Sequence, residues 1–176
     1  MKINNLKMAA VLMFVTLMSF AQNKDDKRII EDAEKVMMTI RNTDKAVEKF
    51  FEDSSGYVVF PNVGEGALII GAASGNGVLY ENGMAVGMAK LKKLDIGLQA
   101  GGEAFTQIIF FENEKNLEDF KNGNFEFSAE AKAVIVDKGA FKKVNYSDGV
   151  LVIAKPKAGV IAGVSVGGQK FQYAPF

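Results

Sequence analysis

From residue 56 onward the chain is a succession of short apolar runs separated by glycine-containing turns, and this pattern constrains the fold most strongly. Residues 94–101 alternate apolar side chains with polar residues or glycine, and residues 125–133 alternate apolar with polar residues. A period of two is typical of strands with one buried face. Residues 105–111 are largely apolar, which predicts a fully buried strand. The pattern therefore predicts a sheet.

Tight turns are predicted at Asn76-Gly77 and Asn82-Gly83, because an asparagine–glycine pair readily adopts the backbone of a two-residue hairpin. Pro61 is expected to end a strand over residues 57–60, since proline donates no ladder hydrogen bond. Pro175 is likewise expected to break the last strand. Further strands are expected at 67–70, 78–80, 150–154, 160–166 and 169–173, and a short helix at 113–121.

The segment before residue 56 is expected to be helical. Its apolar residues recur at intervals of three and four, which makes one apolar stripe. Asn42-Thr43 interrupts the pattern, and Thr43 can cap a second helix. The residues expected to face inward are Ile29, Ile30, Ala33, Val36, Met37, Ile40, Ala46, Val47, Phe50 and Phe51.

Together these elements predict a single domain over residues 22–176, long enough to bury a core. The expected fold class is α+β and mainly antiparallel β. N-terminal helices over 26–54 would pack against a curved, glycine-rich sheet or partly closed barrel over 56–176.

The first 21 residues have the features of a secretory signal peptide. Residues 1–7 carry two lysines, residues 8–18 are apolar except for Thr16, and Ser19-Phe20-Ala21 presents small residues at two positions that signal peptidase reads. The apolar run is shorter than the about 20 residues of a membrane-spanning helix. No cysteine adjoins the cut for lipid attachment. We expect cleavage after Ala21 and a periplasmic or secreted protein that is not a lipoprotein.

The chain contains no histidine, cysteine or tryptophan. Ser-His-Asp and Cys-His catalysis are thereby excluded, and so are zinc sites built from Cys and His. Without the two lysines of the signal peptide, 19 basic residues face 21 acidic ones, a net charge of −2 that is not typical of a nucleic-acid binder. We expect no catalytic residues, no metal, no cofactor and no nucleic-acid partner.

The glycines allow two interpretations. Residues 71–77 lie between strand-like segments, which favours hairpin turns over a phosphate-binding loop, because such a loop must open a helix. Gly97, Gly101, Gly163 and Gly167 fall on one face of the predicted strands. There they allow either a sharp bend and close backbone approach, or a side-chain-free groove for an acyl chain or ring.

Carboxylates are the only acid–base groups left for catalysis. A pair of them flanking a bond could hydrolyse a glycoside. No spacing singles out a pair, so a hydrolase stays an alternative, to be tested at Glu103, Glu112 and Glu130.

Two local clusters of cations are expected at turns, one of them beside an aromatic residue. Such clusters can meet anionic head groups, while a solvated turn is the alternative interpretation. The candidate lipid-binding residues are Lys90, Lys92, Lys93, Phe141, Lys142 and Lys143.

Several segments, in order, resemble the SYLF domain family of lipid-binding modules. The first is the run Gly56-Tyr57-Val58-Val59-Phe60-Pro61-Asn62-Val63, and the similarity extends over about residues 31–176. The later matching segments are the glycine-rich 71–79, the Gly-x-Gln-x-Gly strand at 97–102, the apolar strand and helix at 105–121, Tyr146-Ser147, and the Gly-Val-Ser strand at 163–168.

This resemblance implies binding of phospholipid or phosphoinositide and, in some eukaryotic members, association with actin. The chain departs from the family in having Gly83-Met84-Ala85-Val86 where Gly-x-Trp-Ser is frequent, and in an acidic instead of a basic N-terminal helix. An exported protein meets neither phosphoinositides nor actin, so we do not expect these partners. We expect a non-catalytic domain of an exported bacterial-type protein that binds phospholipid or a membrane surface; the alternative is an envelope structural or protein-interaction domain without a lipid ligand.

Overall fold

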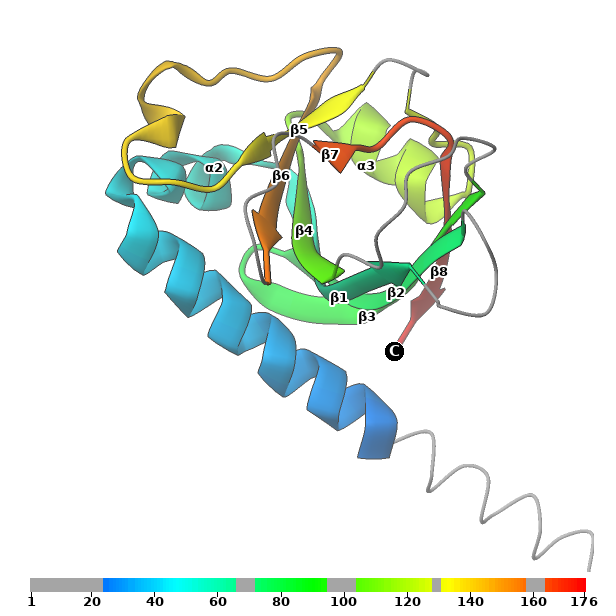
Figure 1. Cartoon of the computed structure of the whole chain (residues 1–176). Coiled ribbons are helices and arrows are strands. Elements are labelled where there is room, and N and C mark those ends of the chain that lie inside the picture. The colour runs from blue at the N-terminus through cyan, green and yellow to red at the C-terminus, as the bar shows by residue number, and fades with distance from the viewer. Residues whose placement is uncertain (1–23, 66–71, 95–103, 128–130, 158–163) are drawn as a thin grey trace, which may run out of the picture.

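The computed structural model of the chain describes residues 24–65, 72–94, 104–127, 131–157 and 164–176. These residues form one curled sheet accompanied by helices (Figure 1). The predicted signal peptide, the predicted strand at 67–70 and all of the predicted strand at 94–101 beyond Leu94 lie outside the described residues, as do Gly97, Gly101 and Gly163.

Eight strands form the sheet in the order β7-β5-β6-β4-β1-β2-β3-β8. Neighbours pair antiparallel throughout, except that β5 runs parallel to β6. The sheet curls into a half-barrel, as Figure 1 shows, which confirms the predicted fold class. The strands are β1 (Gly56–Glu65), β2 (Ala72–Glu81), β3 (Met84–Leu94), β4 (Ala104–Phe111), β5 (Lys132–Ile135), β6 (Val150–Pro156), β7 (Val164–Ser165) and β8 (Gln169–Pro175).

One face of the sheet packs against helix α3 (Glu114–Lys121), which contacts β8 as well as β1 and β4. The predicted helix is confirmed: Asn113 caps it, and its Leu117 and Phe120 are fully buried. Strand β4 is buried along its length except for Ala104, which confirms the predicted buried strand. Residues that alternate along the strands build this core, among them Phe60, Leu91, Ile109, Phe111 and Phe171.

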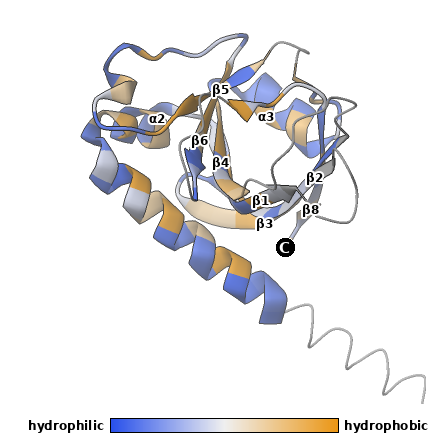
Figure 2. Cartoon of the chain, viewed as in Figure 1, coloured by the Kyte–Doolittle hydropathy of each residue, from blue (hydrophilic) through white to orange (hydrophobic). Residues whose placement is uncertain are grey.

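The other face packs against the N-terminal helices. Residues 24–43 are helical, and apolar and polar residues alternate along this segment (Figure 2). The predicted apolar stripe is confirmed, since Ala33 and Ile40 are buried against the sheet. Two short helices follow, η1 (Lys45–Val47) and α2 (Glu48–Asp53), and α2 buries Phe50 and Phe51. None of the described helices is long and apolar enough to cross a bilayer.

The cap of the second helical segment is Asp44 and not the predicted Thr43. Asp44 Oδ1 accepts a hydrogen bond from Ala46 N at 3.0 Å, whereas Thr43 Oγ1 donates to Thr39 O at 2.9 Å. Asp44 Oδ2 also accepts from Phe141 N at 3.0 Å. The same carboxylate therefore caps η1 and ties it to η2 (Ala140–Lys143), a tertiary contact that the local pattern does not contain.

The prediction that Pro61 ends the first strand is wrong, because β1 continues through Pro61 to Glu65. The register of β1 shifts between Val59 and Asn62, so Pro61 lies in an irregularity where no regular ladder hydrogen bond is needed. Thr106 Oγ1 on β4 donates to Pro61 O at 3.1 Å and fixes this point.

The predicted turn at Asn76-Gly77 is also wrong, because β2 runs straight through these residues. A Cβ added at Gly77 would lie 2.5 Å from Val59 O and 2.6 Å from the Phe60 ring. Glycine at 77 therefore permits close approach of β1 and is not a turn residue. The turn at Asn82-Gly83 is confirmed, with φ of 50° and 76°, as a two-residue hairpin requires.

Three further expectations fail locally. Residues 124–127 are not a strand, although Phe125 and Phe127 still pack together with ring centroids 4.9 Å apart. Pro175 does not break β8, because at the sheet edge it still pairs with Gly87. Residues 90–93 lie within β3 and not at a turn.

Candidate functional site

Three exposed lysines lie on one face of the strands β3 and β8. Along β3 the side chains alternate, so Ala89 and Leu91 point into the interior while Lys90 and Lys92 point outward. On β8, Lys170 lies directly opposite Lys92. We call Lys90, Lys92 and Lys170 the lysine ladder.

Apart from the opposed Lys92 and Lys170, the cross-strand neighbours of the ladder lysines are uncharged. Lys92 lies between Ser74 of β2 and Lys170 of β8, and Lys90 lies between Asn76 and Gln172. Within the described part of the chain, no carboxylate forms an ion pair with any lysine of the ladder. Like charges directly opposite one another on a sheet destabilise it. The sheet therefore carries positive charge that an external anion could neutralise.

A groove of ≈ 430 Å³ adjoins the ladder and brings in a residue from the N-terminal helix. Arg28 lines it from the helix, and Lys157 Nζ donates to Asn62 Oδ1 at its border. Of the lining residues that the structure describes, Asp32 is the only acid. Hydrogen-bond donors and cations thus converge from β2, β3 and the helix. The groove is lined by Arg28, Ile29, Asp32, Pro61, Asn62, Ser74, Gly75, Asn76, Lys90, Leu91 and Lys92.

The six predicted lipid-binding residues do not gather in one place. Lys90 and Lys92 lie at the groove, but Lys93 points to the interior, where its Nζ donates to Ser165 O at 2.9 Å. Phe141 is fully buried in the core beneath α2. We therefore leave Lys93 and Phe141 out of the candidate surface.

Lys142 and Lys143 are exposed on η2, which lies beside α2, away from β3 and β8 in Figure 1. They form a separate cationic cluster. Sequence reasoning missed Arg28 and Lys170 as partners of Lys90 and Lys92. The alternation along β8 places Lys170 on an outer face, but only the register of β8 against β3 places it opposite Lys92.

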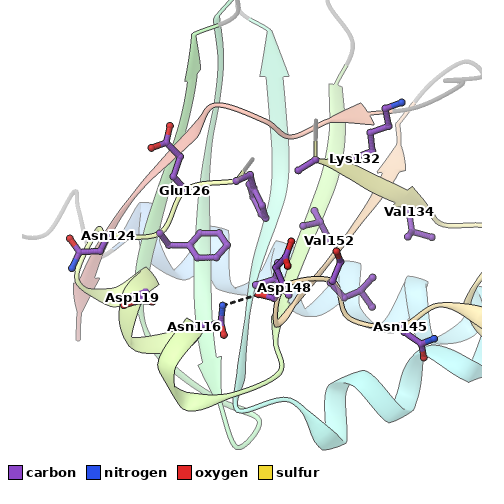
Figure 3. Close-up of a pocket in the computed structure, with 15 residues that line it drawn as sticks. Asn116, Asp119, Asn124, Glu126, Lys132, Val134, Asn145, Asp148 and Val152 are labelled. Atoms are coloured by element: carbon purple, nitrogen blue, oxygen red, sulfur yellow. Dashed lines mark hydrogen bonds between the residues drawn. The ribbon is translucent and has the colours of Figure 1, made fainter. Parts of the chain in front are cut away.

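A second, larger groove of ≈ 630 Å³ lies between the end of α3 and the start of β6 (Figure 3). Its apolar lining includes Phe125, Val134, Val150 and Val152. Among the described residues, its charged lining consists of Asp119, Glu126, Asp148 and Lys132. We call it the carboxylate groove.

The position of Asp148 in this groove is set by a two-residue turn. Asp148 and Gly149 have φ of 53° and 77°, and Ser147 and Val150 exchange backbone hydrogen bonds across them at 2.9 and 3.0 Å. Aspartate tolerates this left-handed backbone. Asn116 Nδ2 of α3 donates to Asp148 O at 3.1 Å, the bond drawn in Figure 3. The helix thus holds the turn against the groove.

The described residues contain no group of three or more carboxylates placed to hold a metal ion. Of the three glutamates considered for hydrolysis, Glu103 and Glu130 lie outside the described residues, and Glu112 is exposed at the end of β4.

The buried tyrosines are placed for packing. Tyr57 and Tyr80 stack with ring centroids 5.3 Å apart, and burial raises the pKa of both hydroxyls.

Residues 92–174 match the family model described as "Ysc84: Las17-binding protein actin regulator". Among curated proteins, none matches the chain. The matched segment runs from Lys92 to Ala174, so it contains the carboxylate groove and two of the three ladder lysines, while Arg28 and Lys90 precede it.

Proposed function

The chain carries a SYLF-type domain of the Ysc84 family over residues 92–174, and from this premise we propose that it is a non-catalytic module that binds anionic phospholipid surfaces. The proposed contact surface is the lysine ladder with the adjoining groove. The observation that carries the proposal is the direct opposition of Lys92 and Lys170 without a neighbouring carboxylate partner among the described residues.

Local charge, and not overall charge, would drive this binding. The chain as a whole has a net charge of zero, so it has no general attraction to an anionic membrane. Each lysine or arginine near an anionic surface contributes about 1 kcal/mol. The three ladder lysines would therefore contribute about 3 kcal/mol when the ladder faces the membrane. Screening by salt should weaken the interaction.

We further propose that the protein acts outside the cytoplasm and without chemistry of its own. The first proposal rests on the signal-like residues 1–21, and the second on the lack of histidine and cysteine. Mass spectrometry of the protein recovered from a secreting host would test cleavage after Ala21.

The binding proposal is tested by sedimentation of the protein with vesicles of phosphatidylcholine, with and without phosphatidylglycerol. We expect co-sedimentation only with the anionic vesicles, and less of it at high salt. The ladder variant Lys90→Gln/Lys92→Gln/Lys170→Gln should bind roughly a hundredfold more weakly, at about 1 kcal/mol per cation.

The matched control is Lys138→Gln/Lys142→Gln/Lys143→Gln, which removes the same charge from exposed positions around η2. It should bind as the unaltered chain does. A loss confined to this control would place the contact at the second cluster, and equal sedimentation with neutral vesicles would contradict the proposal. Recovery of the same envelope proteins before and after delipidation would favour the protein-interaction alternative.

A further inference from the structure

The carboxylate groove has a chemistry opposite to that of the lysine ladder. Glu126 and Asp148 are exposed, and neither forms an ion pair within the described residues. Asp119 is already paired, with its Oδ2 2.6 Å from Lys115 Nζ. Two carboxylates therefore remain available at the groove, and in Figure 3 they come from separate parts of the chain. Lys132 is the one cation in the lining among the residues that the structure describes.

Between these charges the groove presents aliphatic and phenyl surface. Phe125, Ala131, Val134 and Val150 are only partly buried, although they pack against the two cores. Strand β5 pairs with β6 in the described residues only from Val134 onward, so the start of β6 lies beside the groove. Partly exposed apolar side chains beside unpaired charge are typical of the contact surfaces of proteins.

The lining of the carboxylate groove suits an extended peptide better than a membrane or a compact apolar ligand. An anionic membrane would be repelled by Glu126 and Asp148. A compact apolar ligand would remain largely in water, because the groove is open and such ligands bind where most of their surface is buried. An extended peptide fits both parts of the lining, since alternate side chains of an extended chain point in opposite directions. Its aliphatic residues would face the groove while its cations reach the carboxylates at the rim.

We propose that the carboxylate groove docks an extended segment of a partner protein in which lysine or arginine alternates with aliphatic residues. The cations of the segment pair with Glu126 and Asp148, and its aliphatic residues lie on Val134, Val150 and Phe125. The site is separate from the lysine ladder and does not depend on lipid binding. A molecule held on an anionic surface by the ladder could present this groove to a basic partner.

The probe is a fluorescein-labelled peptide of about six residues, long enough to span roughly 20 Å when extended, in which Lys alternates with Val. Fluorescence anisotropy should show saturable binding to the full chain that weakens at high salt. A peptide with Glu in place of Lys should not bind, and one with Ser in place of Val should bind more weakly. Amide shifts in ¹⁵N NMR spectra should concentrate at Glu126, Asp148 and Val150.

The variant Glu126→Gln/Asp148→Asn should bind the peptide about three- to tenfold more weakly, as expected for two exposed ion pairs. Glu52→Gln/Asp53→Asn removes the same two charges from the exposed side of α2 and should leave binding unchanged. Sedimentation with anionic vesicles should not decrease in either variant.

Binding of the Glu peptide as tight as that of the Lys peptide would overturn the proposal. Equal affinity of the two charge variants for the Lys peptide would also overturn it, as would amide shifts at the lysine ladder instead of the groove. The same holds if a neutral oligosaccharide, or self-association of the protein, displaces the peptide. The peptide comparisons use the unaltered chain, so they decide the question even if the groove variant fails to fold.

Discussion

The side-chain amides of Gln107 and Gln169 bind each other inside the half-barrel. Gln107 Nε2 donates to Gln169 Oε1 at 2.7 Å, and Gln169 Nε2 donates to Gln107 Oε1 at 3.0 Å. Both residues are completely buried. Their strands, β4 and β8, are not neighbours in the sheet, so this pair bridges the interior of the curl. A buried polar pair tolerates no loss of one partner, because the other is left without a hydrogen bond.

Replacing one member of this pair should therefore destabilise the fold more than replacing both. We expect Gln107→Leu alone to lower the free energy of unfolding by about 1–3 kcal/mol, because Gln169 keeps a buried, unpaired amide. The double variant Gln107→Leu/Gln169→Leu should recover much of this loss. Urea denaturation measures both. Additive losses in the double variant would show that the pair is not coupled.

Gly77 should not accept even a methyl group. Gly77→Ala would press its Cβ against Val59 O and the Phe60 ring, and we expect a loss of about 1–3 kcal/mol from overpacking. Gly64→Ala in the neighbouring strand is the control, because nothing lies within 4 Å of a Cβ added there. Thermal denaturation of the two variants should separate them clearly, and equal melting temperatures would refute the close-approach explanation.

Tyr80 should tolerate loss of its hydroxyl. The hydroxyl is buried without a hydrogen-bond partner in the described residues, so Tyr80→Phe should leave stability unchanged or raise it by up to about 1 kcal/mol at neutral pH. Burial raises the pKa of Tyr80 above its ordinary value of 10.0, so the folded state resists ionisation. The unaltered chain should thus lose stability as the pH rises above about 10, and the variant should lose less. Alkaline denaturation followed by circular dichroism tests this; identical profiles would count against it.

Asp44 should make the fold sensitive to acid. Hydrogen bonds from the backbone of Phe141 and then of Ala46 hold the pKa of its carboxyl below the usual 3.8. Such a group contributes stability above its unfolded pKa, and the contribution is lost as the pH falls through the folded value. Asp44→Asn keeps one acceptor oxygen but not both, so it should melt at a lower temperature at neutral pH. The difference should shrink below about pH 4. Asp53→Asn, at an exposed position, should show no such dependence.

Replacing Lys170 by glutamate should stabilise the fold and weaken binding to anionic membranes. Lys170→Glu places a carboxylate directly opposite Lys92, which we expect to raise the free energy of unfolding by about 0.2–1 kcal/mol. The same change should weaken sedimentation with anionic vesicles, because it removes one cation of the ladder and neutralises another. Lys143→Glu is the control and should alter neither quantity appreciably. If the Lys170→Glu variant were less stable than the unaltered chain and sedimented equally well with anionic vesicles, the ladder would account for neither the stability nor the membrane binding.

The sequence alone determined those elements whose cause is local. The buried strand at 105–111, helix α3 and the turn at Asn82-Gly83 follow from periodicity, capping and the backbone preference of asparagine and glycine, which neighbours along the chain decide. The fold class follows from the order of these elements, and the segments resembling SYLF domains indicate the family.

The tertiary structure decided those features that depend on how one strand pairs with its neighbour. Asn76-Gly77 is chemically as good a turn as Asn82-Gly83, but close approach of β1 places it inside a strand. Lys92 and Lys170 are 78 positions apart, and only the register of β3 against β8 makes them face each other. Pairing across a sheet is set by the packing of the whole core, so no local pattern states it. For this reason Lys90 and Lys92 could be predicted as candidates, while Lys170 and the surface that the three lysines form could not.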